Sequence, residues 1–382
     1  MFRHELEKEG LLVVRCHAMS SKDVKVAVGL SGGVDSSLAA AMLVAQGYDV
    51  IGLTMKIWQG AYKVQEGLKH ACFGPGEEED IASCERMARM LGIPYHVIDL
   101  SNEYEHHVVE YFREEYKSGR TPNPCIVCNR ELKFGFLADK ARSAGVEFDF
   151  FATGHYARIE ERNGVLYVKR ASDLAKDQSY FLYGLDSQRL KTIMFPLGNM
   201  TKEEVRTLAK SYGLETAEKP ESQDFVAGGD YAPLFEHDVP QPGDIVDRAG
   251  NVLGRHHGLP YYTIGQRRGL GISVGTDPFY VVALDSQKNQ VVVGPNDGLF
   301  SEGLVSKSFR FQDPNTKVSS VRGFAKIRQN HKPVACLLEP GGQGGVVVHF
   351  EVAQRAVAPG QSVVIYSEDG LVLGGGIIDA AV

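Results

Sequence analysis

The sequence contains no run of the roughly 18 apolar residues that a membrane-spanning helix requires. Its N-terminal stretch, MFRHELEKEGLLVVRCHAMSSKD, mixes both charges and lacks the long apolar segment and small-residue cleavage site of a secretory signal. Basic residues are too few to coat the whole surface, because 41 Lys and Arg face 48 Asp and Glu, which gives a net charge of −7. These absences argue against a membrane or secreted protein and predict a cytoplasmic location.

Cysteine is scarce, with six residues in a chain of 382. A cytoplasmic location disfavours structural disulfides, so we expect the cysteines to be reactive or metal-binding. Cys84 is the exception, because it lies at an apolar position of a helical pattern, where a buried core thiol is expected. We assign no function to Cys16 or Cys336.

The first half of the chain alternates between β-type apolar runs and amphipathic helical segments, without an internal repeat. This alternation is typical of a doubly wound parallel sheet, an α/β fold whose ligands bind at the carboxyl ends of the strands. The predicted strands cover 24–30, 49–55, 95–99 and 147–153, and the predicted helices cover 36–46, 77–91, 130–144 and 201–212.

The sequence pattern changes after about residue 215, where Gly and Pro become frequent and the helical periodicity of apolar residues is lost. Short apolar runs such as YVVALD, QVVVGP, GGVVVHF and QSVVIYS are separated by turn residues, which predicts an antiparallel β-barrel. The chain is also too long for one compact domain. We therefore predict an N-terminal extension over 1–22, an α/β domain over 23–212, a small central domain over 213–285 and a C-terminal antiparallel β-barrel over 286–382.

Residues 29–37, GLSGGVDSS, join the first predicted strand to the first predicted helix. A Walker A loop is excluded because no lysine follows the glycines, and the glycine spacing does not fit the dinucleotide-binding fingerprint. The segment S-G-G-x-D-S resembles the pyrophosphate loop (PP-loop) of the ATP pyrophosphatases, which activate a carbonyl oxygen as its adenylate. Backbone N–H groups, serine hydroxyls and the helix dipole suit pyrophosphate, and Asp35 suits Mg²⁺.

Six further segments follow in a fixed order and point to one family. They read TPNPCIVCNRELKF (121–134), ATGHYAR (152–158), KDQSYFLYGL (176–185), FPLGNMTKEEV (195–205), PESQ (220–223) and LPYYTIGQRRGLG (259–271). With the glycine loop they resemble the tRNA-specific 2-thiouridylase family from about residue 24 to about residue 375. The resemblance implies that ATP activates the 2-oxo group of the wobble uridine in the anticodon loop of a tRNA, and that sulfur then replaces this oxygen.

The resemblance also implies roles for individual residues. It makes Cys128 the nucleophile, with Cys125 and Asp35 as further catalytic residues, and it implies ATP, Mg²⁺, tRNA and a sulfur donor protein or sulfide as cofactors and partners. The implied ATP contacts are Gly29, Leu30, Ser31, Gly32, Gly33, Val34, Asp35, Ser36, Ser37, Met55 and Gly154. The implied RNA contacts are Asn123, Pro124, Cys125, Lys176, Asp177, Gln178, Lys326, Arg328 and Gln329.

The sequence departs from the family at one point. Many members carry a second catalytic cysteine after a segment like PESQ, whereas this chain reads PESQDFVAGGDY and has no cysteine between Cys128 and Cys336. In one substitute scheme Cys128 carries a persulfide that Cys125 resolves. In another, Cys72, Cys125 and Cys128 hold an iron–sulfur cluster, [4Fe–4S], whose open iron carries sulfide. Zinc would need a fourth ligand, and a purely structural role of these thiols is a further alternative.

Two other functions remain open at this stage. An ATP pyrophosphatase that amidates a small metabolite would need a glutamine-hydrolysing domain or an ammonia site, and the sequence shows no such domain. A tRNA-binding protein that has lost sulfur transfer would have no need of an intact SGGVDSS loop. The thiouridylase therefore remains the leading prediction.

Overall fold

The fold is described from a computed structural model, which describes residues 23–63, 71–219, 224–226, 231–236, 238–272, 278–316 and 320–382. The predicted extension over 1–22 and the PESQ segment lie outside these residues. The chain divides into two compact units. Unit 1 comprises Met1–Glu105 and Cys125–Asp230, and unit 2 comprises His106–Pro124 and Tyr231–Val382.

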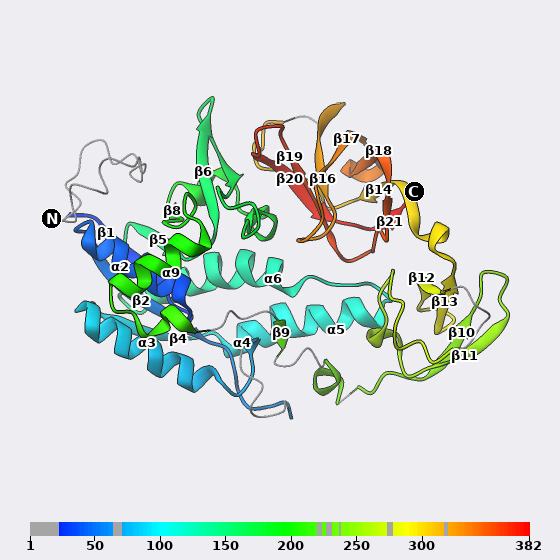
Figure 1. Cartoon of the computed structure of the whole chain (residues 1–382), viewed down its shortest axis with the longest axis horizontal. Helices are drawn as coiled ribbons and strands as arrows, with labels where there is room; N and C mark the ends of the chain where they lie inside the picture. The colour runs from blue at the N-terminus through cyan, green and yellow to red at the C-terminus, as the bar shows by residue number, and fades with distance from the viewer. Residues whose placement is uncertain are drawn as a thin grey trace. The chain divides into compact units, whose positions relative to one another are not determined.

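Unit 1 is built on a five-stranded sheet in the order β4-β2-β1-β5-β8, and all of its neighbouring strands are parallel (Figure 1). The apolar run of the first strand is explained by its central place, because its three middle residues are fully buried. The predicted parallel sheet is thus confirmed. The strands are β1 (Lys25–Gly29), β2 (Asp49–Lys56), β4 (Tyr95–Asp99), β5 (Phe150–Thr153) and β8 (Ile193–Met194).

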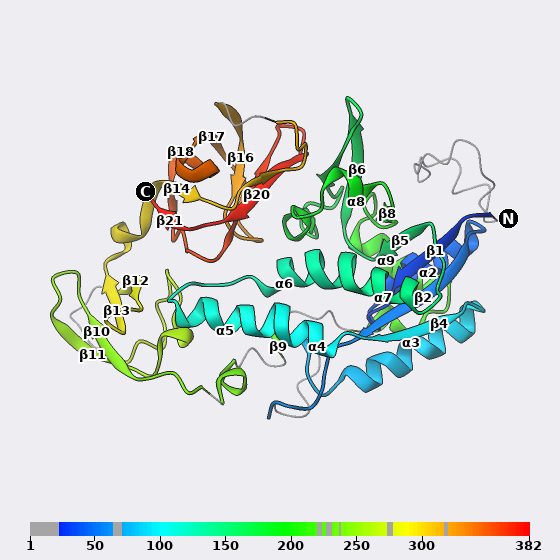
Figure 2. The ribbon, with the colours of Figure 1, turned by 180° about the vertical axis from the view of Figure 1, so that it is seen from behind.

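Helices cover both faces of this sheet. The chain moves from β1 through β2 to β4 in one direction, so right-handed crossovers place the two helices of these connections on the same face of the sheet. It then returns to the other side of β1, and a right-handed crossover in this reversed direction places its helix on the opposite face. Views from the front and from behind show α2, α3 and α9 against one face and α7 against the other (Figures 1 and 2). These helices are α2 (Val34–Ala45), α3 (Glu77–Leu91), α7 (Leu137–Ser143) and α9 (Lys202–Ser211).

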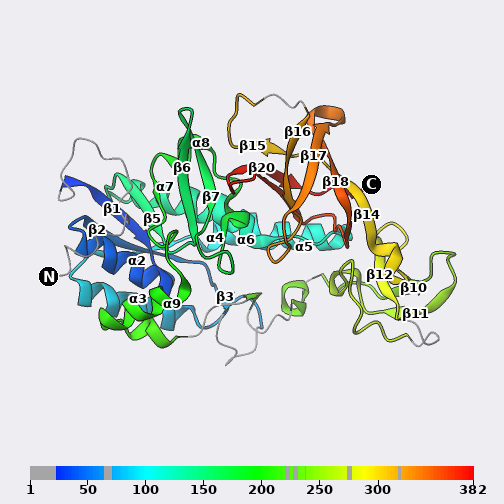
Figure 3. The ribbon, with the colours of Figure 1, turned by 45° about the horizontal axis from the view of Figure 1, so that its top comes forward.

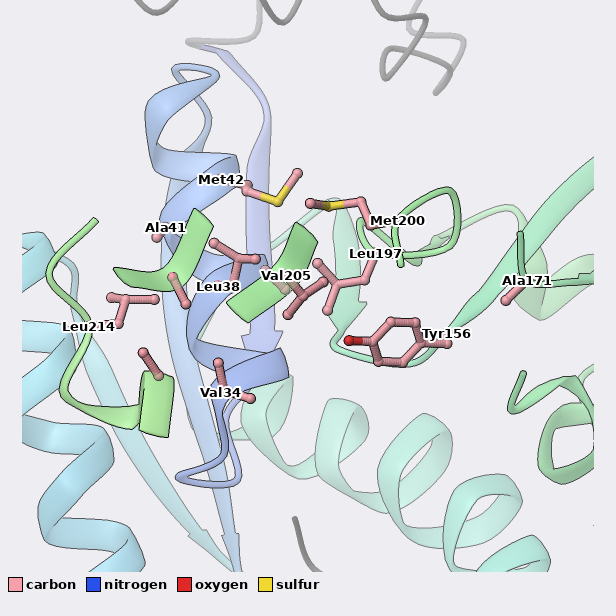
Figure 4. Packing of buried hydrophobic residues seen from close by; sticks show 13 residues of the cluster. Val34, Leu38, Ala41, Met42, Tyr156, Ala171, Leu197, Met200, Val205 and Leu214 are labelled. Carbon is pink, nitrogen blue, oxygen red and sulfur yellow. The ribbon is translucent and has the colours of Figure 1, made fainter. Parts of the chain in front are cut away.

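A buried cluster joins α2 to α9. Leu38 and Met42 of α2 pack near Val205 of α9 and near Leu197, which precedes that helix (Figure 4). Alanines in the middle of α2 leave room for this close packing. The start of α9 is fixed by a capping box, in which Thr201 and Glu204 exchange hydrogen bonds. The segment at 195–205 is therefore held against the helix that follows the glycine loop.

The helix predicted over 130–144 is confirmed in its extent but not in its type. After the short helix α6 (Pro124–Val127), the chain forms a nine-residue π-helix, η3 (Cys128–Phe136), before it continues as α7. A π-helix pairs residues five apart, and such segments are frequent at functional sites. Apolar spacing does not distinguish this wider helix from an α-helix over so few residues.

Two small sheets of unit 1 were not predicted. One is the antiparallel hairpin of β6 (Ala157–Arg162) and β7 (Val165–Arg170). The other pairs β3 (Ala71–Phe73) in parallel with β9 (Asp224–Val226), so the strand that carries Cys72 lies beside the strand that follows PESQ. The aromatic ring of Phe73 stacks on Tyr104 and on Phe225, with ring centroids 5.1 and 6.1 Å apart. This stacking holds the small sheet against the rest of the unit.

Unit 2 contains α5 (Glu110–Lys117) and two sheets. The smaller sheet has the order β11-β10-β13-β12 and the larger has the order β15-β20-β19-β16-β17-β18-β14-β21, with antiparallel neighbours throughout the larger one. Figure 3 shows the larger sheet curling on itself, and a buried apolar cluster fills its concave side. The predicted antiparallel C-terminal region is confirmed. The strands are β10 (Gly243–Val246), β11 (Val252–His256), β12 (Tyr280–Asp285), β13 (Gln290–Gly294), β14 (Phe300–Ser306), β15 (Arg310–Phe311), β16 (Val321–Lys326), β17 (Val334–Pro340), β18 (Val346–Arg355), β19 (Ser362–Tyr366), β20 (Val372–Ile377) and β21 (Ala380–Ala381).

The remaining helices are short and join these elements. Within the described ranges, no helix is long and apolar enough to cross a membrane. The short helices are α4 (Ser101–Tyr104), η2 (Glu105–Val109), η4 (Ser179–Leu182), α8 (Ser187–Leu190), η5 (Glu215–Glu218), η7 (Ala232–Phe235), η8 (Leu259–Tyr261), η9 (Asn296–Leu299) and η10 (Gly342–Gly344).

Candidate active site

The glycine loop lies where β1 ends and α2 begins, at the point where the strand order of the sheet reverses. Gly32 has φ +72°, a left-handed conformation that glycine adopts without strain. Ser36 and Ser37 donate their hydroxyls to the carbonyl of Gly33, at 3.2 and 3.0 Å. No side chain caps the N-terminus of α2, so its first backbone N–H groups are available to an anion.

Asp35 stands in the first turn of α2 and has two partners from distant parts of the chain. The Lys202 ammonium lies 2.8 and 2.9 Å from its two carboxylate oxygens, and the Tyr156 hydroxyl donates to it at 2.8 Å. The Lys202 side chain is only 12% exposed, so this ion pair is shielded from water. Asp35 is therefore held in a fixed orientation beside the glycine loop.

A second lysine reaches the loop from the other side. Lys219, just after η5, donates to the Gly32 carbonyl at 3.1 Å and pairs with Asp80 of α3 at 2.5 Å. Asp80 itself packs against the glycine loop, because a Cβ on Gly32 would lie 3.0 Å from its carboxylate. Two lysines thus flank a loop that has no lysine of its own, where phosphate groups would bring negative charge.

Gly154, which directly follows the neighbouring strand β5, lies against the glycine loop. A Cβ at this position would lie 2.6 Å from the backbone nitrogen of Ser36 and 2.7 Å from the carbonyl carbon of Asp35. Only glycine lets β5 approach the loop this closely. The adjacent His155 is hydrogen-bonded through Nδ1 to the Thr153 hydroxyl at 2.8 Å. Burial and the nearby Lys133 hold the pKa of His155 well below its usual value, so its ring is neutral near pH 7.

Gly154→Ala is expected to weaken ATP binding at least about tenfold, because the new methyl group would push the loop backbone out of place. Isothermal titration with ATP measures the effect. Gly76→Ala is the matched control, since Gly76 has an ordinary φ of −79° and a Cβ there would meet nothing within 4 Å. Equal ATP affinity in both variants would contradict a nucleotide site at this loop.

Three cysteines gather elsewhere in unit 1. Cys125 lies in α6, Cys128 begins η3, and Cys72 lies in β3, level with Phe225 of the paired strand β9. Cys128 is buried, whereas Cys72 and Cys125 are exposed. The three thiols are close enough to perturb one another electrostatically. The structure therefore brings Cys72 to the C-x-x-C pair, as the sequence hypothesis of a joint site requires.

The surroundings keep the thiols of Cys125 and Cys128 protonated near neutral pH. Loss of solvation and the neighbouring Cys72 and Cys128 raise the pKa of Cys125 to about 12. Loss of solvation also raises the pKa of Cys128 to about 11, and the Lys133 ammonium opposes this rise. Cys84, by contrast, is 1% exposed in the core beneath the sheet, which confirms its prediction as a buried thiol. A thiolate at Cys128 thus needs a bound partner or a further positive charge.

The chemistry of the donor set suits an iron–sulfur cluster better than a hard cation, because it consists of three thiols. Within the described part of the chain, however, no group of three or more His, Cys, Asp or Glu side chains is placed so that it could hold a metal ion. The three cysteines provide the right ligand atoms for a cluster and lie near one another. In this conformation, however, they are not placed closely enough to bind one. Asp35 likewise has lysine and tyrosine partners where Mg²⁺ is expected.

The residues with an implied RNA role occupy varied environments. Asp177 is 2% exposed and accepts hydrogen bonds from the backbone of Ala171 and Ser179, which is a structural role. Gln178 accepts from the Tyr156 backbone N–H at 2.9 Å, so the 176–178 segment supports the tyrosine that contacts Asp35. Lys176 is half-buried, and Asn123 and Pro124 belong to unit 2.

The barrel residues with an implied RNA role are also less open than expected. Lys326 is 4% exposed, and Arg328 donates to the carbonyls of Ile264 and Ala356. Gln329 is half-buried beside them. A positively charged sequence segment therefore does not by itself define an open basic surface.

Sequence reasoning missed four residues of this site. Lys202, Lys219 and Tyr156 contact the glycine loop or Asp35, and Lys133 lies among the thiols. Lys202, Tyr156 and Lys133 lie within the family segments at 195–205, 152–158 and 121–134, and Lys219 directly precedes PESQ.

The parallel sheet, its crossovers and the S-G-G-x-D-S loop at the carboxyl end of β1 define an α/β fold of the PP-loop class. Three family models match the chain: a tRNA methyl transferase HUP domain at 24–227, a tRNA methyl transferase PRC-barrel domain at 234–295 and an aminomethyltransferase beta-barrel domain at 301–378. The chain belongs to the tRNA-specific 2-thiouridylase (MnmA) family.

Relatives named tRNA-specific 2-thiouridylase MnmA match nearly the whole chain. The protein of Endomicrobium trichonymphae is 45% identical over 93% of this chain and 99% of its own length. That of Acetivibrio thermocellus is 44% identical over 94% of this chain and 100% of its own length. A solved 4-thiouridine synthetase–RNA complex with bound ATP is 18% identical, covers 54% of this chain and 46% of that chain, and has a TM-score of 0.37, too low to bear on function.

Proposed function

We propose that the protein is an ATP-dependent tRNA sulfurtransferase that converts the wobble uridine to 2-thiouridine. The observation that carries this proposal is the presence in one compact unit of a phosphate-binding loop and a group of three thiols, linked through Gly154, His155 and Lys133. Adenylation needs the loop, and sulfur transfer needs the thiols. Membership of the thiouridylase family supports the same reaction.

In the first half-reaction the uracil O2 oxygen attacks the α-phosphorus of ATP. A bond forms between this oxygen and phosphorus, the bond to the bridging oxygen breaks, and pyrophosphate leaves with that electron pair. The uncapped N-terminus of α2 and the serine hydroxyls bind the leaving pyrophosphate. We propose that Asp35 binds Mg²⁺ when ATP is present, with Lys202 moving from the carboxylate to the phosphates.

In the second half-reaction a persulfide route needs only Cys128 and Cys125. The terminal sulfur of a Cys128 persulfide, supplied by a donor persulfide, bonds to C2, and AMP leaves with the O2 oxygen and the electron pair. The Cys125 thiolate then attacks the Cys128 sulfur, which breaks the S–S bond and releases 2-thiouridine. A Cys125–Cys128 disulfide remains, and an external dithiol reduces it.

An iron–sulfur cluster is the alternative sulfur carrier. Cys72, Cys125 and Cys128 would hold it, and the pairing of β3 with β9 supports this set because it fixes Cys72 in the same unit. When bound, such a cluster would supply a fourth iron that is free of protein ligands and can carry sulfide. The raised thiol pKa values favour bound over free thiolates, because a metal replaces the proton.

The remaining proposals concern partners and organisation. We propose that Lys176, Gln178, Gln329 and residues 123–125 contact the anticodon arm, and that the protein acts in the cytoplasm, where tRNA is modified. The four-part division at residues 22, 212 and 285 also remains a proposal. The sulfur donor is a persulfide-bearing protein or sulfide.

The function is tested by tRNA-dependent ATP–pyrophosphate exchange together with mass spectrometry of nucleosides from the treated tRNA. We expect exchange only when tRNA is present, and 2-thiouridine only when a sulfur donor is added. A protein that merely binds tRNA would show no exchange. An amidating enzyme would show exchange with a small metabolite and none with tRNA.

A further inference from the structure

The segment between β7 and η4 holds Lys202 in place through its backbone. The Asp173 carboxylate accepts a hydrogen bond from the Lys202 backbone N–H at 3.1 Å and another from the Ala175 N–H at 3.0 Å. Lys202 is the first residue of α9, so its N–H has no partner within the helix. The capping box at the start of α9 uses two other N–H groups of this turn. Asp173 therefore fixes the backbone of the residue whose ammonium lies on Asp35.

The far end of the same segment holds the second partner of Asp35. The Gln178 backbone N–H donates to the Tyr156 carbonyl at 2.8 Å, and the Tyr156 N–H donates to the Gln178 side-chain oxygen at 2.9 Å. The Tyr156 hydroxyl in turn donates to Asp35 at 2.8 Å. The Lys202 ammonium also lies 5.5 Å from the centre of the Tyr156 ring. One short segment thus anchors both groups that orient the carboxylate.

The segment is itself fastened at further points, so it can act as a rigid support. The Ser172 N–H donates to the Gly198 carbonyl, shortly before α9, at 2.9 Å. Asp177 is 2% exposed and accepts hydrogen bonds from two backbone N–H groups, at 3.0 and 3.2 Å. Removal of the Asp173 carboxylate therefore releases the start of α9 on this side while the rest of the segment stays bonded.

We propose that Asp173 is a positioning residue for adenylation, because it sets the place from which the Lys202 ammonium reaches the phosphates. This inference rests on the proposed function, in which Lys202 moves from Asp35 to the phosphates when ATP binds. A lysine side chain turns about its own Cα, so a fixed backbone position decides where its ammonium arrives. Asp173 supplies that fixed position without touching the nucleotide, and a misplacement of about 1 Å is enough to lower a rate by about a hundredfold.

The test is a double-mutant cycle of Asp173→Ala and Lys202→Met, measured by isothermal titration with ATP and by tRNA-dependent ATP–pyrophosphate exchange. Asp173→Ala alone is expected to weaken ATP binding by about tenfold and to slow exchange at least as much. In the Lys202→Met background the same substitution is expected to change neither quantity, because the group that Asp173 positions is absent. Asp173→Asn is expected to keep most of the wild-type affinity, since its amide oxygen still accepts from an N–H.

Asp186→Ala is the matched control. Asp186 caps α8 in the same unit by accepting from the N–H groups of Gln188 and Arg189, so it shares the chemistry of Asp173 without a bond to Lys202. Its removal is expected to leave the ATP affinity unchanged. Equal losses from Asp173→Ala with and without the Lys202 ammonium would indicate a general effect on folding and would overturn the inference. Wild-type ATP affinity in a folded Asp173→Ala protein would overturn it as well.

The titration separates this inference from the proposed function, because it needs neither tRNA nor a sulfur donor. Non-additive ATP affinities in a protein without tRNA-dependent exchange support the inference and refute the proposed function. Additive affinities in a protein that thiolates tRNA do the reverse, and wild-type protein that does not bind ATP refutes both. If Asp173→Ala does not fold, Asp173→Ser takes its place in the cycle, because a serine hydroxyl supports a turn of this kind.

Discussion

Cys128→Ser is expected to abolish tRNA thiolation, by on the order of a thousandfold or more, while tRNA-dependent ATP–pyrophosphate exchange continues. The two half-reactions separate because the loop and its lysines, which hold the phosphates, do not include the thiol. Exchange is measured with labelled pyrophosphate, and thiolation by mass spectrometry of nucleosides. Cys336→Ser is the control, because Cys336 is buried in unit 2 with its thiol on the Gly323 carbonyl.

Cys125→Ser and Cys72→Ser distinguish the two sulfur carriers. In the persulfide route, Cys125→Ser traps the tRNA on Cys128 as a mixed disulfide that a dithiol releases, and Cys72→Ser stays active. In the cluster route, anaerobically purified protein holds about four irons with acid-labile sulfide, and each of the three substitutions removes both. Thiolation by Cys128→Ser at the wild-type rate would refute both routes at once.

Lys202→Met is expected to lower the rate of ATP–pyrophosphate exchange by about a hundredfold to a thousandfold. Lys202 is the shielded cation on both oxygens of Asp35, and its loss removes positive charge from the place where pyrophosphate develops. The thiols lie outside this cluster, so their number and reactivity toward a thiol reagent should not change. The exchange assay at saturating tRNA measures the loss.

The matched control for Lys202→Met is Lys210→Met on the same helix. Lys210 is 59% exposed and pairs with Glu218, so its removal changes the charge of α9 without touching Asp35. Thermal unfolding of both variants shows whether the capping box and the α2–α9 cluster remain intact. Wild-type exchange by a folded Lys202→Met protein would rule out a phosphate role for Lys202.

The glycine loop was predictable because its signal is local. A buried strand, two glycines and a helix follow one another within GLSGGVDSS, and the fold places this turn at a sheet edge. Its lysine partners were not predictable in the same way. Lys202 and Lys219 reach Asp35 and Gly32 across 167 and 187 positions, which no short-range pattern records. Spacing likewise carries no information on the pairing of β3 with β9.

The burial of individual polar side chains was not predictable from the sequence, and the RNA contacts implied for such residues stay predictions. Asp177 and Lys326 belong to segments with implied RNA contacts, yet both are almost fully buried. A carboxylate that satisfies backbone N–H groups looks the same in sequence as one that faces solvent. Cys72 shows the opposite case, because an isolated cysteine outside every motif lies beside the C-x-x-C pair once β3 is paired.

The region around the π-helix η3 lowers the free energy of unfolding of the chain. A π-helix in place of an α-helix and a buried Asn129 side-chain oxygen without a hydrogen-bond partner each cost folding free energy. Substitutions that relieve these costs would make the chain more resistant to heat. Selection for thermal stability alone would therefore erase this region, and its presence marks a trade-off in favour of activity.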